Sequence, residues 1–177
     1  LGIESARQTV ARLKKGRRVE ELEQFALNDS MTGMYNRNAY DYFVKNEKDF
    51  EGYVIVTFDL NNLKQCNDQY GHRAGDEYII NAAHIIEDNF ERYGKCYRIG
   101  GDEFCCIIPK GRYFKIERVM HKIDQDVEIL NHKNIIPVPV GIAYGYAVFT
   151  ADDTDPEKVR ERADEDMYRN KKAMKQS

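Results

Sequence analysis

Three carboxylates have the type and spacing to hold a divalent metal ion: Asp59, Asp102 and Glu103. Asp59 closes an apolar run, and the other two follow a pair of glycines in Gly100-Gly-Asp-Glu103. If the strands beside the glycine turn flank the apolar run, Asp59 and Asp102 converge at one edge of a sheet. Carboxylate oxygens suit Mg²⁺, and metal ions bridged by carboxylates suit phosphoryl or nucleotidyl transfer. Taken singly, each piece has a simpler interpretation as a capped turn or a glycine turn.

The segment directly after Asp59 has features of a phosphate site. It reads Leu60-Asn-Asn-Leu-Lys64, and a chain that passes from a strand into a helix start offers free backbone N–H groups to an anion. Lys64 would add positive charge, although exposure on the surface is the commoner role of a lysine.

A possible base-reading pair follows at Asn67 and Asp76. A carboxylate can accept hydrogen bonds from both N1–H and the exocyclic amine of guanine, whereas adenine presents an acceptor at N1. Asp76, supported by the Asn67 amide, could therefore separate guanine from adenine. The simpler interpretation of Asp76 is a helix N-cap. His72 is given no catalytic role.

The elements that would position these residues follow from hydrophobic periodicity. Residues 53–59 are apolar and β-branched, which predicts a strand buried on both faces. Strands at 96–99 and 104–108 are expected to form a hairpin, and a long strand at 138–150 contains Gly141 and Gly145 as signs of a bulge or close approach. Helices are predicted over 36–47, 61–69, 76–92 and 113–131 and from Pro156 onward, with a turn over Gly71–Gly75. This order indicates an α/β sandwich with a central mixed sheet.

Residues 5–27 predict a separate N-terminal helix. Its apolar stripe is thin, consisting of Val10, Leu13, Leu22 and Phe25, and charged residues surround it. Such a helix suits a linker or a coiled coil better than a core element. The alternative is a solvated helix that packs on its own domain.

Composition limits the remaining possibilities. A chain of 177 residues predicts one domain, and 42% hydrophobic residues can form a core. The net charge of −3 provides no global field for nucleic acid or an anionic membrane, and we find neither a membrane span nor a signal peptide. The four cysteines form no CxxC pair, so we expect reduced thiols, no zinc and a cytoplasmic location. Because the chain begins with Leu1, we expect a piece of a longer protein.

Several segments together resemble one family. Residues 98–104, Arg-Ile-Gly-Gly-Asp-Glu-Phe, contain the signature of GGDEF domains. Residues 29–37 (Asp-Ser-Met-Thr-Gly-Met-Tyr-Asn-Arg) are similar to the family's first motif, and residues 58–64 and 67–76 to its metal and guanine motifs. Ala163-Asp164, Tyr168 and Lys171 resemble its last helix. The match covers roughly residues 28–175, which leaves 1–27 as a linker helix and 28–177 as the GGDEF domain.

The resemblance implies a diguanylate cyclase, which joins two GTP molecules into cyclic di-GMP and releases pyrophosphate. It implies an α+β sandwich with a mainly antiparallel sheet, like that of nucleotide cyclases and polymerase palm domains. Each domain would bind one GTP, so catalysis would require a homodimer. An upstream sensor in the longer protein would control that pairing through the linker helix. Nucleic acid and membrane would not be partners of this fragment.

The resemblance also implies site roles. Asp59 and Asp102 would hold Mg²⁺ or Mn²⁺ through their side chains and Leu60 through its carbonyl, while Glu103 would help to deprotonate the attacking ribose 3′-hydroxyl or assist a second metal. Asn67 and Asp76 would read guanine. The residues implied in phosphate binding are Asn62, Leu63, Lys64 and Lys171.

Four departures from the family pattern are visible. Asn61 stands where a second Asp is usual, Leu63 replaces a common Phe, and Lys175 replaces an Arg that helps to hold phosphate. The product-binding motif R-x-x-D is absent, because the corresponding stretch is Glu91-Arg-Tyr-Gly94. We therefore expect no product inhibition through that site.

Three other functions remain open. A GGDEF-like module could bind GTP or a protein partner without turnover, which the Asn61 substitution favours. A cyclase could make a different cyclic dinucleotide, although Asp76 argues against this. A purely structural domain would leave the combined motifs unexplained.

Overall fold

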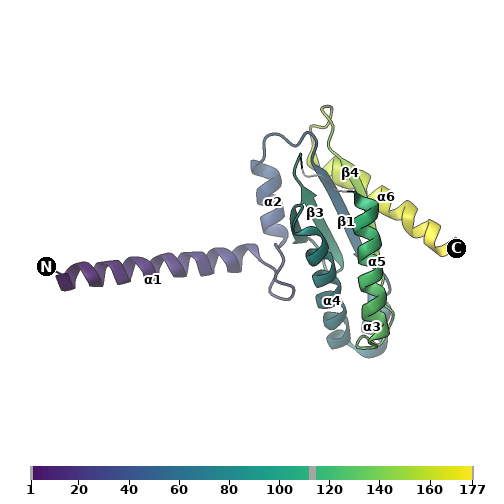
Figure 1. Cartoon of the computed structure of the whole chain (residues 1–177), viewed down its shortest axis with the longest axis horizontal. Helices are drawn as coiled ribbons and strands as arrows, with labels where there is room; N and C mark the ends of the chain where they lie inside the picture. Colours follow the sequence, from purple (N-terminus) through teal and green to yellow (C-terminus); the bar gives the residue numbers. More distant parts are fainter. Residues whose placement is uncertain (1, 112–114, 177) are drawn as a thin grey trace.

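The computed structural model describes residues 2–111 and 115–176, and the side chains of these except 2–7, 9–10, 23–25 and 173–176. Helices and strands are interspersed along the chain (Figure 1). The elements are α1 Gly2–Leu27, α2 Arg37–Asn46, β1 Val54–Leu60, α3 Leu63–Tyr70, α4 His72–Phe90, β2 Lys95–Arg98, β3 Glu103–Ile108, α5 Ile116–His132, β4 Ile142–Val148 and α6 Pro156–Gln176.

The four strands form one sheet in the order β2-β3-β1-β4, and neighbouring strands run antiparallel. The hairpin β2–β3 therefore lies beside β1, which is the condition under which Asp59 and Asp102 were expected to converge. In the β1–β3 register, Asp59 is opposite Glu103. An isolated parallel bridge joins Tyr35 to Tyr97 at the outer edge of β2. The predicted fold class, a mainly antiparallel sheet flanked by helices, is confirmed.

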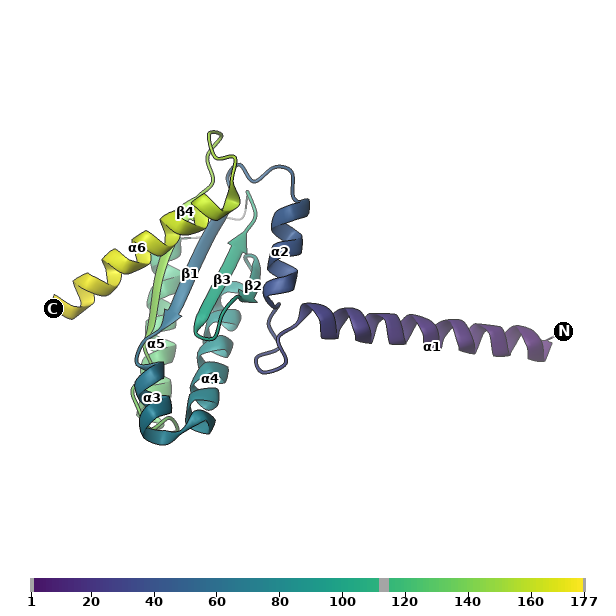
Figure 2. The same cartoon turned by 180° about the vertical axis from the view of Figure 1, so that it is seen from behind.

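Helices cover both faces of the sheet, and each face has its own apolar core. On one face, α4 and α5 pack on side chains such as Phe58 and Phe104. On the other, α2 and α6 pack on Ile55 and Cys105, and α6 crosses β4 and β1 (Figure 2). Because side chains alternate along a strand, Cys106 faces the first core while Cys105 faces the second. All four cysteines are free and buried.

Helix α6 follows the outer edge of β4. Three of its side chains, spaced four residues apart, bond to the backbone of every second residue of the strand. The bonds join Arg162 Nη2 to the Val148 carbonyl, Asp166 Oδ2 to the Tyr146 N–H and Asn170 Nδ2 to the Tyr144 carbonyl, at 3.0, 3.1 and 3.1 Å. Matching helical and strand periods thus fix the helix along the edge.

Gly145 allows this close approach. A Cβ there would lie 2.1 Å from the Met167 nitrogen and 2.2 Å from the Ala163 oxygen, both backbone atoms of α6. The close approach predicted at Gly145 is therefore confirmed.

Helix α1 extends away from the rest of the chain (Figure 1). Leu13 and Leu22 are 68% and 60% exposed, so these two members of the apolar stripe do not pack on the domain; the side chains of Val10 and Phe25 lie outside the described ones. This arrangement favours the linker interpretation over the packed one. The boundary at residue 27 remains a prediction, although α1 ends at Leu27.

Asn36 joins α1 to α2. Its Nδ2 donates to the carbonyls of Ala26 and Asn28 at 2.9 and 3.2 Å, and its backbone N–H donates to the Leu27 carbonyl at 2.8 Å. Its Oδ1 accepts from the Ala39 N–H at 3.0 Å and so caps α2. One side chain thus serves the end of α1 and the start of α2.

Two predicted boundaries are wrong. The turn expected over residues 71–75 is confined to Gly71, with φ of 83°, and α4 begins at His72. The strand expected over 138–150 is shorter, because the Asn131 side chain pairs with both backbone groups of Val140, at 2.8 and 3.0 Å, in place of a neighbouring strand. Among the described residues, no helix has the length and apolar character needed to cross a membrane.

Candidate active site

The three predicted carboxylates lie at one end of the β1–β3 pair. Asp59 is opposite Glu103 in the ladder, and the Leu60 N–H donates to the Asp102 carbonyl at 3.3 Å. The glycine turn is closed by N–H groups of Ile99 and Gly100, which donate to the Glu103 carbonyl at 3.0 and 3.2 Å. Asp59 and Asp102 are partly buried and Glu103 is exposed. The antiparallel register therefore gathers negative charge beside an open surface.

Lys171 brings positive charge to this cluster from α6. Its Nζ lies 2.7 Å from Oδ1 of Asp59, and both side chains are 27% exposed. The preceding residue, Asn170, is bonded to β4, so the helix position that carries Lys171 is fixed. Asp164 lies nearer the start of α6 than Lys171; burial, with the negative charges of Glu157 and Asp59 adding to it, raises the pKa of Asp164.

The loop between β1 and α3 has an unusual backbone. Asn62 is left-handed, with φ of 62°, and precedes α3 without a side-chain capping bond. The first N–H groups of α3 are thus left to other partners. The Leu63 side chain is 7% exposed and belongs to the core, so only its backbone can meet a phosphate. Lys64 is exposed at the second position of α3.

Tyr78 holds this loop through hydrogen bonds of its buried hydroxyl. Its hydroxyl donates to the Asn61 carbonyl and accepts from the Gly141 N–H, both at 2.7 Å. Burial raises the pKa of Tyr78 to about 12, so the hydroxyl keeps its proton. Sequence reasoning missed this residue, although a phenol on the apolar face of a helix signals a buried hydrogen bond.

Asn67, on α3, contacts α4 at Gly75, the residue before Asp76. A Cβ at Gly75 would lie 1.9 Å from Asn67 Oδ1, so Asn67 packs directly against the residue before Asp76. Asp76 is exposed within α4, whose N-cap is Gly71. The N-cap interpretation of Asp76 is therefore wrong, and its side chain is exposed to solvent.

Arg98 connects the glycine turn to the segment after α1. Its Nη1 contacts both oxygens of Asp29, at 3.0 and 3.2 Å, and its Nη2 donates to the Gly101 carbonyl at 2.9 Å. Asp29 also accepts from the N–H and hydroxyl of Thr32. Burial opposes ionisation, but the bonds from Thr32 and Arg98 outweigh it and lower the pKa of Asp29. Both partners belong to recognised motifs, yet nothing in their spacing revealed the contact.

The donor set fits a magnesium ion that is shared with a nucleotide. No cluster of three or more Cys, His, Asp or Glu ligands occurs in the described part of the chain. Mg²⁺, however, is usually held by one or two carboxylates together with substrate phosphates, and Asp59 and Asp102 supply that number. Asp59 already accepts a cation, the Lys171 ammonium. The role expected of Lys175 falls outside the described side chains.

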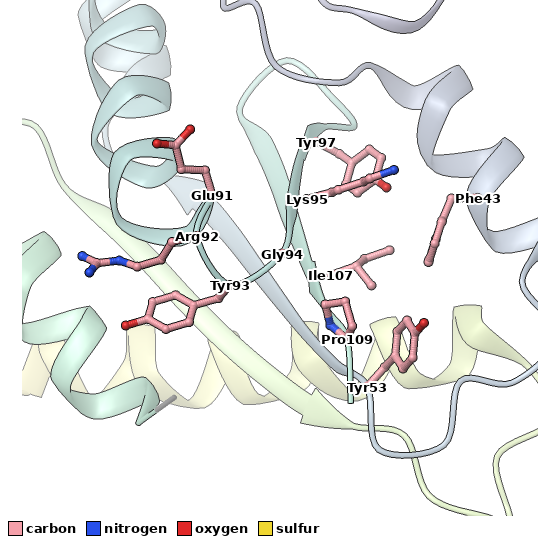
Figure 3. A pocket seen from close by; sticks show the side chains of 10 residues that line it. All are labelled: Phe43, Tyr53, Glu91, Arg92, Tyr93, Gly94, Lys95, Tyr97, Ile107 and Pro109. Atoms are coloured by element: carbon pink, nitrogen blue, oxygen red, sulfur yellow. The ribbon is translucent and has the colours of Figure 1, made fainter. Parts of the chain in front are cut away.

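A separate pocket of about 270 Å³ lies beside β2, which contributes Lys95 and Tyr97 to it. None of the predicted site residues lines this pocket. Aromatic side chains gather on one side of it, whereas Arg92 and Tyr93 point the other way (Figure 3). Gly94 also lines it, and a Cβ at Gly94 would be 2.1 Å from the Ile107 carbonyl oxygen. An aspartate therefore cannot occupy position 94 without a backbone shift.

Comparison with known proteins decides the family. The model of the family "Diguanylate cyclase, GGDEF domain" matches residues 26–177. The chain belongs to this family. The GGDEF assignment made from the sequence is confirmed, and with it the class of enzyme.

Two curated relatives of this GGDEF domain carry the same assignment. The bifunctional diguanylate cyclase/cyclic di-GMP phosphodiesterase MucR of Pseudomonas aeruginosa is 31% identical over 147 residues, 78% of this chain and 22% of MucR. The diguanylate cyclase DgcS of Shewanella oneidensis is 28% identical over 158 residues, 86% of this chain and 52% of DgcS. The chain thus spans between about a fifth and a half of these proteins.

Solved structures share the fold. The coiled coil and GGDEF domain of DgcB from Caulobacter crescentus, in complex with c-di-GMP, has a TM-score of 0.78 at 23% identity and covers 98% of this chain and 95% of that one. The diguanylate cyclase SiaD of P. aeruginosa, in complex with its activator SiaC, has a TM-score of 0.71 at 23% identity, covering 96% and 72%.

Proposed function

We propose that this GGDEF domain condenses two GTP molecules into cyclic di-GMP with release of two pyrophosphates. The observation that carries the proposal is the β1–β3 register, which sets Asp59 opposite Glu103 beside Asp102. In each half-reaction, a ribose 3′-oxygen forms a bond to the α-phosphorus of the other GTP, and the bond from that phosphorus to the pyrophosphate oxygen breaks. Glu103 takes the 3′-hydroxyl proton or assists a second metal.

Asp59, Asp102 and the Leu60 carbonyl would hold Mg²⁺ or Mn²⁺. When bound, such an ion activates the attacking hydroxyl and neutralises charge on the leaving pyrophosphate. The backbone at Asn62 and Leu63, with Lys64, would hold the terminal phosphates; the left-handed Asn62 supports this role, because it leaves the first N–H groups of α3 uncapped. Lys171 would add its charge from α6.

Asn67 and Asp76 would select guanine. The contact of Asn67 with Gly75 supports this, since it brings the Asn67 amide to the residue that precedes the exposed Asp76. We expect Asp76→Ala to reduce the preference for GTP over ATP, measured by competition for binding, with Asp68→Ala as the matched exposed control. Unchanged discrimination would assign base reading to another residue.

Two copies must face each other, because one site holds one GTP and the product needs two. The extended α1 supports control of that pairing by an upstream sensor. The departure at Gly94 supports the absence of product inhibition through an R-x-x-D motif. A cytoplasmic location, where GTP and Mg²⁺ are supplied, completes the proposal; cell fractionation of the whole protein tests it.

The test is incubation of the domain at high concentration with GTP and Mg²⁺, followed by chromatography. Cyclic di-GMP and pyrophosphate are expected from the unaltered domain, whereas Asp102→Ala and Glu103→Ala should retain the fold by circular dichroism and make none. Full activity of either variant would refute its assigned role.

The second candidate is a module that binds GTP without turnover. Asn61, in place of the family's usual second acidic residue, favours it. Calorimetric GTP binding with no product, even when two domains are joined through a dimeric coiled coil fused to α1, would establish this alternative.

A further inference from the structure

Lys171 and Asp59 form an ion pair inside the proposed metal and nucleotide site. The ammonium contacts Oδ1 of Asp59 at 2.7 Å, so it occupies one of the two carboxylate oxygens available to a metal. Each partner retains only 27% of its side-chain exposure. This pair is thus better shielded from solvent than an ordinary surface pair, in which screening removes most of the attraction.

The neighbouring charges explain why the pair forms. Glu103 is opposite Asp59, and Asp102 follows the same turn, so three carboxylates share one end of the sheet. The next lysine on the helix does not help, because Lys172 Nζ lies 4.4 Å from the centroid of the Tyr168 ring. When no metal ion is bound, Lys171 therefore provides the positive charge that pairs with Asp59.

The helix can stay in place while this contact changes. Asn170 and Asp166 bond α6 to β4, but the Lys171 stem has four flexible carbons and its ammonium has no fixed bond direction. A change of side-chain rotamer is enough to release Asp59 and to reach another anion within the same site.

We propose that Lys171 is a built-in counter-ion that couples metal binding to nucleotide binding. A metal ion arriving alone must displace the ammonium and leave it without a partner, so metal alone binds weakly. A metal ion arriving with a triphosphate gives Lys171 phosphate oxygens in exchange for Asp59. Each ligand therefore strengthens binding of the other by the same factor. The nucleotide half of this inference rests on the proposed function.

The first experiment measures Mn²⁺ binding in the absence of nucleotide, by electron paramagnetic resonance of the free ion. Lys171→Met keeps the length of the stem and removes the charge. It should bind Mn²⁺ about fivefold more tightly, because the metal no longer has to break a partly exposed ion pair, and fivefold is the affinity change that corresponds to the free energy of such a pair. Lys172→Met removes the adjacent charge and should stay within about twofold of the unaltered domain. Lys171→Arg keeps the charge and should also bind weakly.

The second experiment repeats the titration with α,β-methylene-GTP, which cannot release pyrophosphate. The analogue should strengthen Mn²⁺ binding to the unaltered domain by about fivefold more than to Lys171→Met. Three results would overturn the inference. Lys171→Met could bind Mn²⁺ no more tightly than the unaltered domain, or Lys172→Met could bind Mn²⁺ as tightly as Lys171→Met. The third is that the analogue strengthens Mn²⁺ binding by the same factor in all variants. Undetectable Mn²⁺ binding by Lys171→Met would overturn it as well.

The two proposals can fail separately. Tighter Mn²⁺ binding by Lys171→Met in a domain that makes no cyclic di-GMP supports the counter-ion and refutes the cyclase. Product formation with metal binding indifferent to Lys171 refutes only the counter-ion.

Discussion

Removal of the Arg98 side chain should damage both stability and catalysis. Arg98→Met keeps an apolar stem but loses two contacts to Asp29 and one bond to the Gly101 carbonyl. The side chains of Arg98 and Asp29 are 12% and 21% exposed, so the loss lies between the ~1 kcal/mol of exposed pairs and the 3–5 kcal/mol of buried ones. We expect a loss of about 2–3 kcal/mol, or a Tm lower by about 5–10 °C.

Urea denaturation provides the measurement, and pH provides a second signature. The folded state lowers the pKa of Asp29 from its ordinary value of 3.8. The ionised Asp29 carboxylate therefore contributes fully to the free energy of unfolding above pH 3.8, and this contribution is lost as the pH falls through the lowered pKa of the folded state. The stability difference between Arg98→Met and the unaltered domain should therefore narrow under acid. Arg92→Met, which alters an exposed arginine over Tyr93, is the matched control and should change stability by less than about 0.5 kcal/mol.

A double-mutant cycle with Asp29→Asn tests the reasoning directly. The two substitutions should couple by about 1–2 kcal/mol, because each removes the same contact. The cyclase rate should fall about tenfold or more, since Gly101 precedes Asp102 and small displacements of reacting groups are costly. Coupling below about 0.5 kcal/mol would refute the assigned link.

Three further substitutions or measurements test other contacts. Gly145→Ala should lower the free energy of unfolding in urea by more than about 3 kcal/mol, because the added Cβ meets the backbone of α6. Gly16→Ala is the control, because there is open space around Gly16. A loss below about 1 kcal/mol at Gly145 would contradict the close packing. Tyr78→Phe should cost about 1–3 kcal/mol by leaving the Gly141 N–H unpaired and should weaken GTP binding in calorimetry; unchanged values would remove its supporting role. Burial raises the pKa of the Cys105 and Cys106 thiols well above the ordinary value, so at pH 8 Ellman's reagent should label them only as fast as the domain unfolds, and immediate labelling would disprove their burial.

The sequence predicts most of the fold because its periods are strong. The buried strand at 53–59 and the hairpin after Cys96 are local patterns, and both appear in the sheet. The errors concern boundaries that distant side chains determine. Asn131 pairs with Val140, so β4 begins only after that residue. Asn67 packs on Gly75, which belongs to helix α4 and not to the expected turn.

In the candidate site too, residues in local motifs could be predicted from the sequence, whereas residues that act through distant partners could not. The carboxylates at Asp59, Asp102 and Glu103 could be named from motif and spacing, and the register brings them to one end of the sheet. Tyr78 and Arg98 could not be assigned, because Asn61 and Asp29, which they contact, lie 17 and 69 residues away from them in the chain. The pairing of Lys171 with Asp59 spans 112 residues and depends on how α6 lies across the sheet.

The bonds between α6 and β4 also affect how copies of this domain can meet. The outer edge of a sheet is a template for strand addition, and so for aggregation. Here the backbone of β4 is occupied by side chains from α6, and the outer edge of β2 is paired with the chain around Tyr35. If two copies meet through their nucleotide sites, as proposed, the closed edges would make that encounter more selective, since association through sheet extension is suppressed.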